Sequence, residues 1–451
     1  GTGINASFEI DTGYATATLG YGWGTGTWSG SQGWGLAGST PVDLPQQDWW
    51  FDQFDNDLVM NVRNGPIYYW ERGSASTPGT ALATRAILLE DLAGAADVPD
   101  AAMQILVSQN DKHLLAFGCQ PYAGSAGDFD PLLIRWATQD NPAIWTPLVT
   151  NSAGFLRVSR GSAIVRAIAT RQEILVFTES TLSSLQFTGT SDVFSLQEIG
   201  DNLSFIGPRA ATVVNNMTFW MGHDKFYVYS WRVETLPCTL RDHVFNNINY
   251  DQAAQIVCGT NEGWNEVWWE YPSGSSQVND SYVIYNHLER IWYYGTLERS
   301  AWLDSPLREF PQAAAYNATT ELSYLYNHEN GANDDTLPMT AYIQSSDFDL
   351  QDGDQFMLTR RMIPDINFDG STAANPEATF SIKPRNFPGG AYQSNASNAQ
   401  RVIQTTVNQF TNEVFMRARA RQVGVKVQST GLDTQWQLGS PRLDMRPDGK
   451  R

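Results

Sequence analysis

The chain has 451 residues, of which 42% are apolar and only 17% are charged, and this composition argues against a disordered protein. Acidic residues outnumber basic ones, and the net charge of −19 disfavours non-specific nucleic-acid binding by the whole surface. No apolar run approaches the roughly 18 residues that a transmembrane helix needs, so we expect no membrane span. The 16 Trp, 18 Tyr, 21 Phe and 37 Gly are typical of a β-rich protein, because aromatic side chains fit pleated sheets. We therefore predict an all-β fold.

Residues 1–45 form a segment rich in Gly, Thr and Trp, in which Trp23, Trp28 and Trp34 stand among glycines. Glycine has no side chain to pack, so an ordinary core strand is not expected here. The segment is interpreted either as an arm that contacts another surface or as a loop folded onto its own domain. In the first case the three tryptophans are candidate interface residues.

Residues 46–336 show short apolar runs that alternate with Asn, Gly and Asp turns, as in Leu58–Val62 and Ile67–Trp70 on either side of Asn64-Gly65. This pattern indicates antiparallel hairpins. One run per unit begins near residues 58, 114, 174, 217, 267 and 322, close to the spacing of roughly 40 to 50 residues in propeller blades. We predict an irregular six-bladed β-propeller, with a pair of β-sandwiches as the alternative. Only Ala81–Ala96 has the Ala and Leu content of a helix.

Residues 337–451 have longer and more regularly alternating runs, which predict a second, sandwich-like β unit. A strand is expected over Phe415–Gln428. Within it Arg417, Arg419 and Arg421 alternate with small or apolar residues, so one face should be basic. Residues 401–451 contain nine basic and four acidic residues, a net charge of +5, against −24 for the preceding 400 residues. The candidate residues for contact with DNA or an acidic partner are Arg417, Arg419, Arg421, Arg442, Arg446, Lys450 and Arg451.

Motifs that would indicate catalysis, a cofactor or a metal are not found in the sequence. The five histidines lack metal-ligand spacing, and the three cysteines are widely separated. The stretch Asp347–Asp354 resembles a calcium loop, but the spacing of its acids departs from the EF-hand pattern. A polar hairpin is the favoured interpretation, and a weak cation site stays open.

A glycosidase is the main enzymatic alternative, because paired carboxylates can cleave glycosidic bonds. Acids that could form such a pair, and tryptophans that could stack on sugars, are Asp128, Asp130, Glu266, Glu270, Trp268 and Trp269. The sequence does not single out one pair among its 48 acidic residues. We predict no enzymatic activity, with a carbohydrate-active or carbohydrate-binding propeller as the alternative.

Several segments resemble a known family. The stretch Trp49–Val59 followed by Gly65–Trp70 is similar to the opening of bacteriophage tail hub proteins. The central and terminal segments that carry the same resemblance are Ile174–Phe187, Ile206–Ala210, Phe219–Tyr227, Trp436–Asp444 and Pro447–Arg451. The resemblance covers residues 49–451 and depends on pattern more than on one invariant motif.

The resembling family is the nozzle of short-tailed bacteriophages, also called tail tubular protein B or packaged-DNA stabilisation protein. The resemblance implies a virion protein that forms a homo-hexameric ring of propellers, with the tail adaptor above it and fibres or spikes at its periphery. Such a ring closes the channel through which double-stranded DNA passes without sequence-specific contacts. The family has no catalytic residues and no cofactor.

Overall fold

The computed structural model describes residues 48–72, 86–125, 127–190, 192–317, 322–350, 353–390, 392 and 402–450. The predicted arm over residues 1–45, with Trp23, Trp28 and Trp34, lies outside this range. The chain divides into two compact units between His328 and Glu329, whereas the sequence analysis placed the division after residue 336. Almost all regular structure in both units is β-strand, which confirms the predicted all-β fold.

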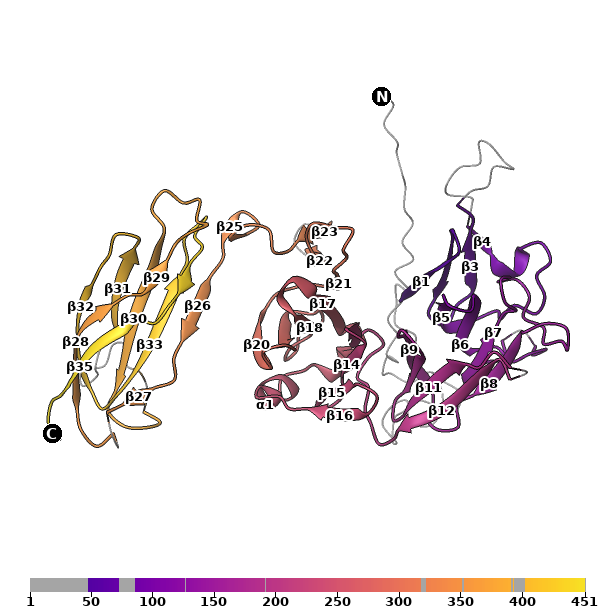
Figure 1. Ribbon diagram of the computed structural model, residues 1–451, viewed down its shortest axis with the longest axis horizontal. Helices are drawn as coiled ribbons and strands as arrows, with labels where there is room; N and C mark the ends of the chain where they lie inside the picture. The colour runs from indigo at the N-terminus through magenta and orange to yellow at the C-terminus, as the bar shows by residue number, and fades with distance from the viewer. Residues whose placement is uncertain are drawn as a thin grey trace, which may run out of the picture. The chain divides into compact units, whose positions relative to one another are not determined.

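The first unit is a series of antiparallel sheets, each built from consecutive strands (Figure 1). The first sheet comprises β1 (Trp49–Phe54), β2 (Asp57–Val62), β3 (Ile67–Trp70) and β4 (Ala86–Leu88). The second comprises β5 (Ala102–Ser108), β6 (His113–Cys119), β7 (Asp130–Trp136) and β8 (Gly154–Arg157). The third comprises β9 (Ile164–Ala169), β10 (Ile174–Thr178), β11 (Leu182–Phe187) and β12 (Phe194–Gly200).

The remaining sheets of this unit continue the same order. The fourth comprises β13 (Ala211–Val214), β14 (Met217–Met221), β15 (Phe226–Tyr229) and β16 (Val233–Leu236). The fifth comprises β17 (Val257–Asn261), β18 (Glu266–Tyr271), β19 (Ser281–Asn286) and β20 (Ile291–Thr296). A three-stranded sheet follows, with β21 (Ala301–Leu303), β22 (Gln312–Asn317) and β23 (Leu322–Asn327). The described residues of the first unit thus contain six consecutive sheets.

Each sheet packs face to face on the next, and the four largest apolar clusters of this unit each join two consecutive sheets. Trp145 lies in the cluster between the first two sheets, Phe117 between the second and third, Trp220 between the third and fourth, and Trp269 between the fourth and fifth. A sandwich has a single inter-sheet core, whereas here both faces of a sheet are covered. Four-stranded meanders stacked in chain order make the first unit propeller-like.

The fifth sheet contacts the sixth through aromatic stacking. The Trp302 ring of β21 lies parallel to the Trp268 ring of β18, with centroids 4.8 Å apart, and the Trp302 Nε1–H donates to the Thr260 carbonyl. Gly259 makes this approach possible, because a Cβ at this position would lie 2.2 Å from Trp302 Cδ1. The Trp302 indole therefore packs into a recess that Gly259 leaves open, and a hydrogen bond from the Glu262 N–H to Asp304 at 2.8 Å also joins the two sheets.

Helical structure in the first unit is short. It consists of α1 (Arg241–Phe245) and the 3-10 turns η2 (Leu89–Asp91), η3 (Tyr250–Gln255) and η4 (Glu262–Trp264). The helix predicted over Ala81–Ala96 is wrong for its described part, residues 86–96. Ala86–Leu88 pair with β3, the Leu89 side chain is buried in the first inter-sheet core, and Gly94 has a positive φ of 85°. Sheet-edge pairing and burial therefore outweigh the helix propensity of Ala and Leu.

The second unit has two main sheets. One contains β26 (Ala341–Gln344), β27 (Phe348–Asp349), β30 (Glu377–Arg385), β31 (Ile403–Asn408) and β33 (Gln422–Ser429). The other contains β28 (Met357–Ile363), β32 (Val414–Ala420) and β35 (Arg442–Pro447). Two small pairs are β24 (Asn333–Asp334) with β25 (Leu337–Pro338) and β29 (Ile366–Asn367) with β34 (Gln437–Leu438).

One apolar core joins the inner faces of the two main sheets, with Phe380 from one sheet and Met357, Met362 and Met416 from the other. This arrangement is a β-sandwich, as the sequence predicted for this part of the chain. The long strand predicted over Phe415–Gln428 is wrong in detail. It is two strands, β32 and β33, which belong to different sheets, so the chain changes sheet at Arg421.

Candidate basic face and other candidate sites

The outer face of the three-stranded sheet β32–β28–β35 in the second unit carries most of the predicted basic residues. Along β32, Met416, Ala418 and Ala420 are buried in the sandwich core, while Arg417 and Arg419 alternate with them and are exposed. The period of two therefore places both arginines on the solvent side, as the sequence predicted.

The strand register adds arginines from the two neighbouring strands. Leu358 of β28 pairs with Arg419 on one side and with Arg446 on the other. Ile363 pairs with Arg442, which is also exposed. Side chains at paired positions share a face of the sheet, so Arg419, Arg442 and Arg446 lie on the same surface.

Two further arginines of this surface were missed by the sequence analysis. The register of β28 shifts between Thr359 and Arg361, and this bulge leaves both Arg360 and Arg361 exposed. The Arg-Arg doublet interrupts the alternation of β28, and that interruption was the available signal. We call the exposed set Arg360, Arg361, Arg417, Arg419, Arg442 and Arg446 the basic face.

Acidic side chains offset part of this charge. Arg361 Nη1 lies 3.1 Å from Glu413, Arg419 Nε lies 2.5 Å from Asp448, and Arg446 Nε lies 3.7 Å from Asp444. No ion pair involves Arg360, Arg417 or Arg442 within the described part of the chain. The basic face therefore keeps positive charge that its own acids do not match.

The end of the basic face is ordered by an aromatic ring. The guanidiniums of Arg419 and Arg421 lie 4.2 Å and 5.1 Å from the centroid of Phe356. Arg421 is only partly exposed, and its Nη2 donates to the Lys450 carbonyl at 3.4 Å. Lys450 Nζ in turn pairs with Asp354 at 2.7 Å. Arg421 and Lys450 thus border the basic face, while Arg451 lies outside the described residues.

The four carboxylates considered for a glycosidase are divided between two sheets. Asp128 and Asp130 belong to the region of the second sheet, where Asp130 pairs with Arg157 at 2.7 Å, and Glu266 and Glu270 belong to β18 in the fifth. Glu266 and Glu270 are four residues apart along one strand, which separates them by about 13 Å. Glycosidase carboxyl groups are about 5 to 9.5 Å apart.

Glu270 is nevertheless unusual. It is buried, and neither carboxylate oxygen has a hydrogen-bond partner within the described residues. Burial raises the pKa of Glu270 to about 8, against which the charge of Arg299 acts only weakly. At neutral pH this carboxyl is therefore mostly protonated in the folded protein.

The acids of Asp347–Asp354 that the structure describes are engaged by protein side chains. Asp347 pairs with Arg385 at 2.5 Å and accepts a hydrogen bond from Tyr392, while Asp349 accepts one from Gln422 at 3.0 Å. Among the described residues no group of three or more metal-ligating side chains is found, and Asp352 is not among them. These contacts favour the polar-turn interpretation of this stretch.

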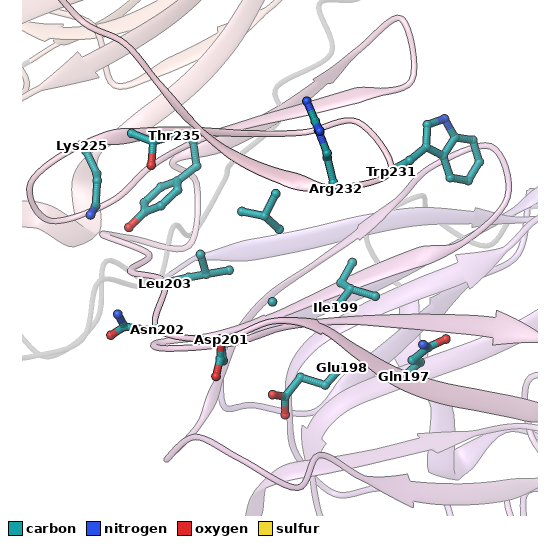
Figure 2. Close-up of a pocket in the computed structure, with 13 residues that line it drawn as sticks. Gln197, Glu198, Ile199, Asp201, Asn202, Leu203, Lys225, Trp231, Arg232 and Thr235 are labelled. Carbon is teal, nitrogen blue, oxygen red and sulfur yellow. The ribbon is translucent and has the colours of Figure 1, made fainter.

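A groove of about 680 Å³ lies between the third and fourth sheets (Figure 2). One wall is formed by residues 197–203, the end of β12 and the loop after it, and the other by the β15–β16 hairpin. Figure 2 shows Ile199 and Leu203 on the first wall, with Lys225 and Arg232 on the second. Trp231 lies at the turn of the hairpin, with a φ of 66° and 63% of its surface exposed.

Helices in the described ranges are all too short and too polar to cross a membrane. No protein-family model and no curated protein matches the sequence.

Solved structures with a partly similar backbone include the computationally designed Ika8 protein, with a TM-score of 0.36 and 11% identity over 62% of this chain and 70% of that chain. For Kluyveromyces lactis Hsv2 the TM-score is 0.35, with 11% identity over 63% of this chain and 75% of that chain. For the AfRom2 CNH domain the TM-score is 0.35, with 11% identity over 66% of this chain and 86% of that chain. Scores at this level assign neither fold nor function.

Proposed function

We propose that this chain is a structural protein of a short-tailed bacteriophage tail. In this proposal it forms a homo-hexameric nozzle below the portal and adaptor, closes the DNA channel, and takes part in retaining and ejecting the genome. The adaptor and the fibres or spikes are its protein partners, and double-stranded DNA passes it without base-specific contacts. The support comes from the sequence resemblance and from the propeller-like unit followed by a sandwich.

The observation that carries the proposal is the basic face. Three of its arginines have no acidic partner among the described residues, although the whole chain has a net charge of −19. A positive surface on an otherwise acidic protein suits local contact with phosphates or with an acidic protein. The acidic remainder would repel DNA and leave it free to slide.

The test compares two quadruple variants of the full chain. One replaces Arg360, Arg361, Arg417 and Arg442 by Gln, and the control replaces the exposed first-unit arginines Arg157, Arg160, Arg232 and Arg241 by Gln. Binding to a short DNA duplex is measured between 50 and 200 mM salt, and particle assembly is measured with the adaptor and portal.

We expect the basic-face variant to reduce the slope of log affinity against log salt by about 3 to 4, since each lost phosphate contact removes about 0.9. The control should change the slope by less than 1. Wild-type DNA binding and full particle yield in the basic-face variant would contradict the proposal. So would a chain that sediments as a monomer both alone and with the adaptor.

A second candidate is carbohydrate binding, because the groove between the third and fourth sheets combines the exposed Trp231 ring with acidic and amide side chains. Aromatic faces and polar rims suit sugars. Screening wild type and Trp231→Ala against surface polysaccharides decides between the two functions. Binding that Trp231→Ala abolishes would favour this candidate, and glycan cleavage would overturn the non-catalytic proposal altogether.

A further inference from the structure

Three arginines and one aspartate lie close together in the first unit. They are far along the sequence from the basic face. Arg63 follows β2, Arg166 lies on β9, and Arg209 lies two residues before the start of β13, while Asp48 directly precedes β1. Arg166 and Arg209 share a neighbour, Trp50 of β1. The guanidinium carbons of Arg166 and Arg209 lie 4.6 Å and 3.9 Å from the centroid of its ring.

Asp48 is already used by one of the three arginines. Arg209 donates from Nε and Nη2 to the Asp48 carboxylate at 3.0 Å and 2.8 Å, and also donates to the Trp49 carbonyl. Arg166 and Arg63 each donate from Nη1 to a backbone carbonyl, of Pro208 at 2.8 Å and of Val165 at 3.2 Å. Neither Arg63 nor Arg166 has a carboxylate of its own within the described residues.

Two buried donors of this cluster have no acceptor. The Arg166 Nε and the Trp50 Nε1 are both inaccessible to solvent, and neither has a hydrogen-bond partner in the described part of the chain. Leaving a buried donor unpaired is costly, especially on a charged group. The two unpaired donors adjoin each other, because the Arg166 guanidinium lies over the Trp50 ring, and Arg63 is near enough for its charge to act on Arg166.

The positive charges of the cluster exceed its negative charge. Burial, together with the charges of Arg209 and Arg63, lowers the pKa of Arg166 to about 9, while Asp48 and the Cys258 thiol act in the opposite direction. Burial also lowers the pKa of Arg63, with Asp48 opposing and Arg209 adding to the effect. Arg63, Arg166, Arg209 and Asp48 together carry a formal charge of +2 when all are ionised.

We propose that this cluster is a binding site for an oxyanion, with a phosphate or carboxylate group received by Arg63 and Arg166. The planar guanidinium offers paired donors that match either group. An anion here would offset the excess charge and supply acceptors for the unpaired donors of Arg166 and Trp50. Asp48 holds Arg209 in place through the bidentate pair, and so completes the wall of the site. This site is independent of the tail function and of the basic face.

The test is thermal unfolding of the full chain at pH 7 in sodium chloride, with sodium phosphate or sodium acetate replacing chloride at constant ionic strength. A ligand at 100 times its dissociation constant should raise the melting temperature of wild type by roughly 5 °C. Arg166→Met and Arg63→Met keep the apolar stem of the side chain and should each lose most of this rise. Arg157→Met, at an exposed ion pair of the same unit, should keep it.

The basic-face variant of Arg360, Arg361, Arg417 and Arg442 should also keep the rise, which separates this site from phosphate binding in the second unit. A rise with acetate as well as phosphate would identify any oxyanion as a ligand, and a rise with phosphate alone would limit the site to phosphate. No rise in wild type with either salt would overturn the proposal. An undiminished rise in Arg63→Met would do the same, even where Arg166→Met does not fold.

Discussion

Arginines gather at two places in this protein, and their surroundings are opposite. In the first unit the guanidiniums of Arg166 and Arg209 pack on the Trp50 ring and donate hydrogen bonds to backbone carbonyls. In the second unit Arg360 and Arg417 stand on the outer face of an exposed sheet. The same side chain is therefore largely enclosed by protein at the first place and open to a large partner at the second, where water screens its charge.

The two units differ in how they bury ionisable side chains. Most buried polar atoms without a partner among the described residues, including those of Arg166 and Glu270, lie in the first unit, where sheets cover each other on both faces. The second unit has one core between two sheets, and its ion pairs lie mostly at the surface. Changes in pH and charge should accordingly affect the stability of the first unit more.

The largest effect is expected for Glu270→Gln. The pKa of this carboxyl is about 8 in the fold and 4.5 as an ordinary value, so the unfolded chain binds fewer protons between these limits. The stability of the wild type should therefore fall as pH rises from about 4.5 to about 8. Gln cannot ionise, so the unfolding free energy of the variant should rise relative to that of the wild type as pH increases, by up to roughly 4 kcal/mol at pH 9. Urea unfolding at pH 5, 7 and 9 measures the difference in unfolding free energy between the variant and the wild type. A difference that is constant across pH would contradict the prediction.

The next effect compares two ion pairs. Asp48→Asn leaves Arg209 without its carboxylate in a site that is largely covered, and should cost about 3 kcal/mol of unfolding free energy. Asp354→Asn removes the exposed partner of Lys450 and should cost less than about 1 kcal/mol. Urea unfolding followed by Trp fluorescence measures both. Equal losses would show that burial does not separate the two groups of arginines.

A smaller effect is expected at Phe356, which supports Arg419 and Arg421 at the end of the basic face. Phe356→Leu keeps an apolar side chain but removes the aromatic ring, and each cation–π contact at an exposed site is worth about 0.5 to 1 kcal/mol. We expect a loss of about 1 kcal/mol. The same substitution combined with Arg419→Gln and Arg421→Gln is the control, because the ring then has no cation to hold and its replacement should cost less.

The smallest effect on stability is expected for the basic face itself. Replacing Arg360, Arg361, Arg417 and Arg442 by Gln should change the unfolding free energy by less than about 1 kcal/mol in total, since of the four only Arg361 belongs to an ion pair among the described residues. Calorimetry measures this change in unfolding free energy. A loss of several kcal/mol would show that these arginines stabilise the sandwich and are not kept for a partner.

Local sequence patterns determined much of the strand structure. Ile67–Trp70 is a strand with the predicted bounds and Leu58–Val62 lies within β2, because β-branched and aromatic runs between turn residues leave little choice of structure. The period of two along Arg417 and Arg419 also determined which side chains point outward.

Long-range packing decided what the pattern could not. The change of sheet at Arg421 depends on which strands pair with β32 and β33. Ala86–Leu88 form a strand because their backbone pairs with β3. The meeting of Asp48, Arg63, Arg166 and Arg209 joins residues more than 100 positions apart, and no local spacing encodes it. Sequence periodicity sets the direction of each side chain within its strand, whereas the burial of a charge and its partners depends on how the sheets stack.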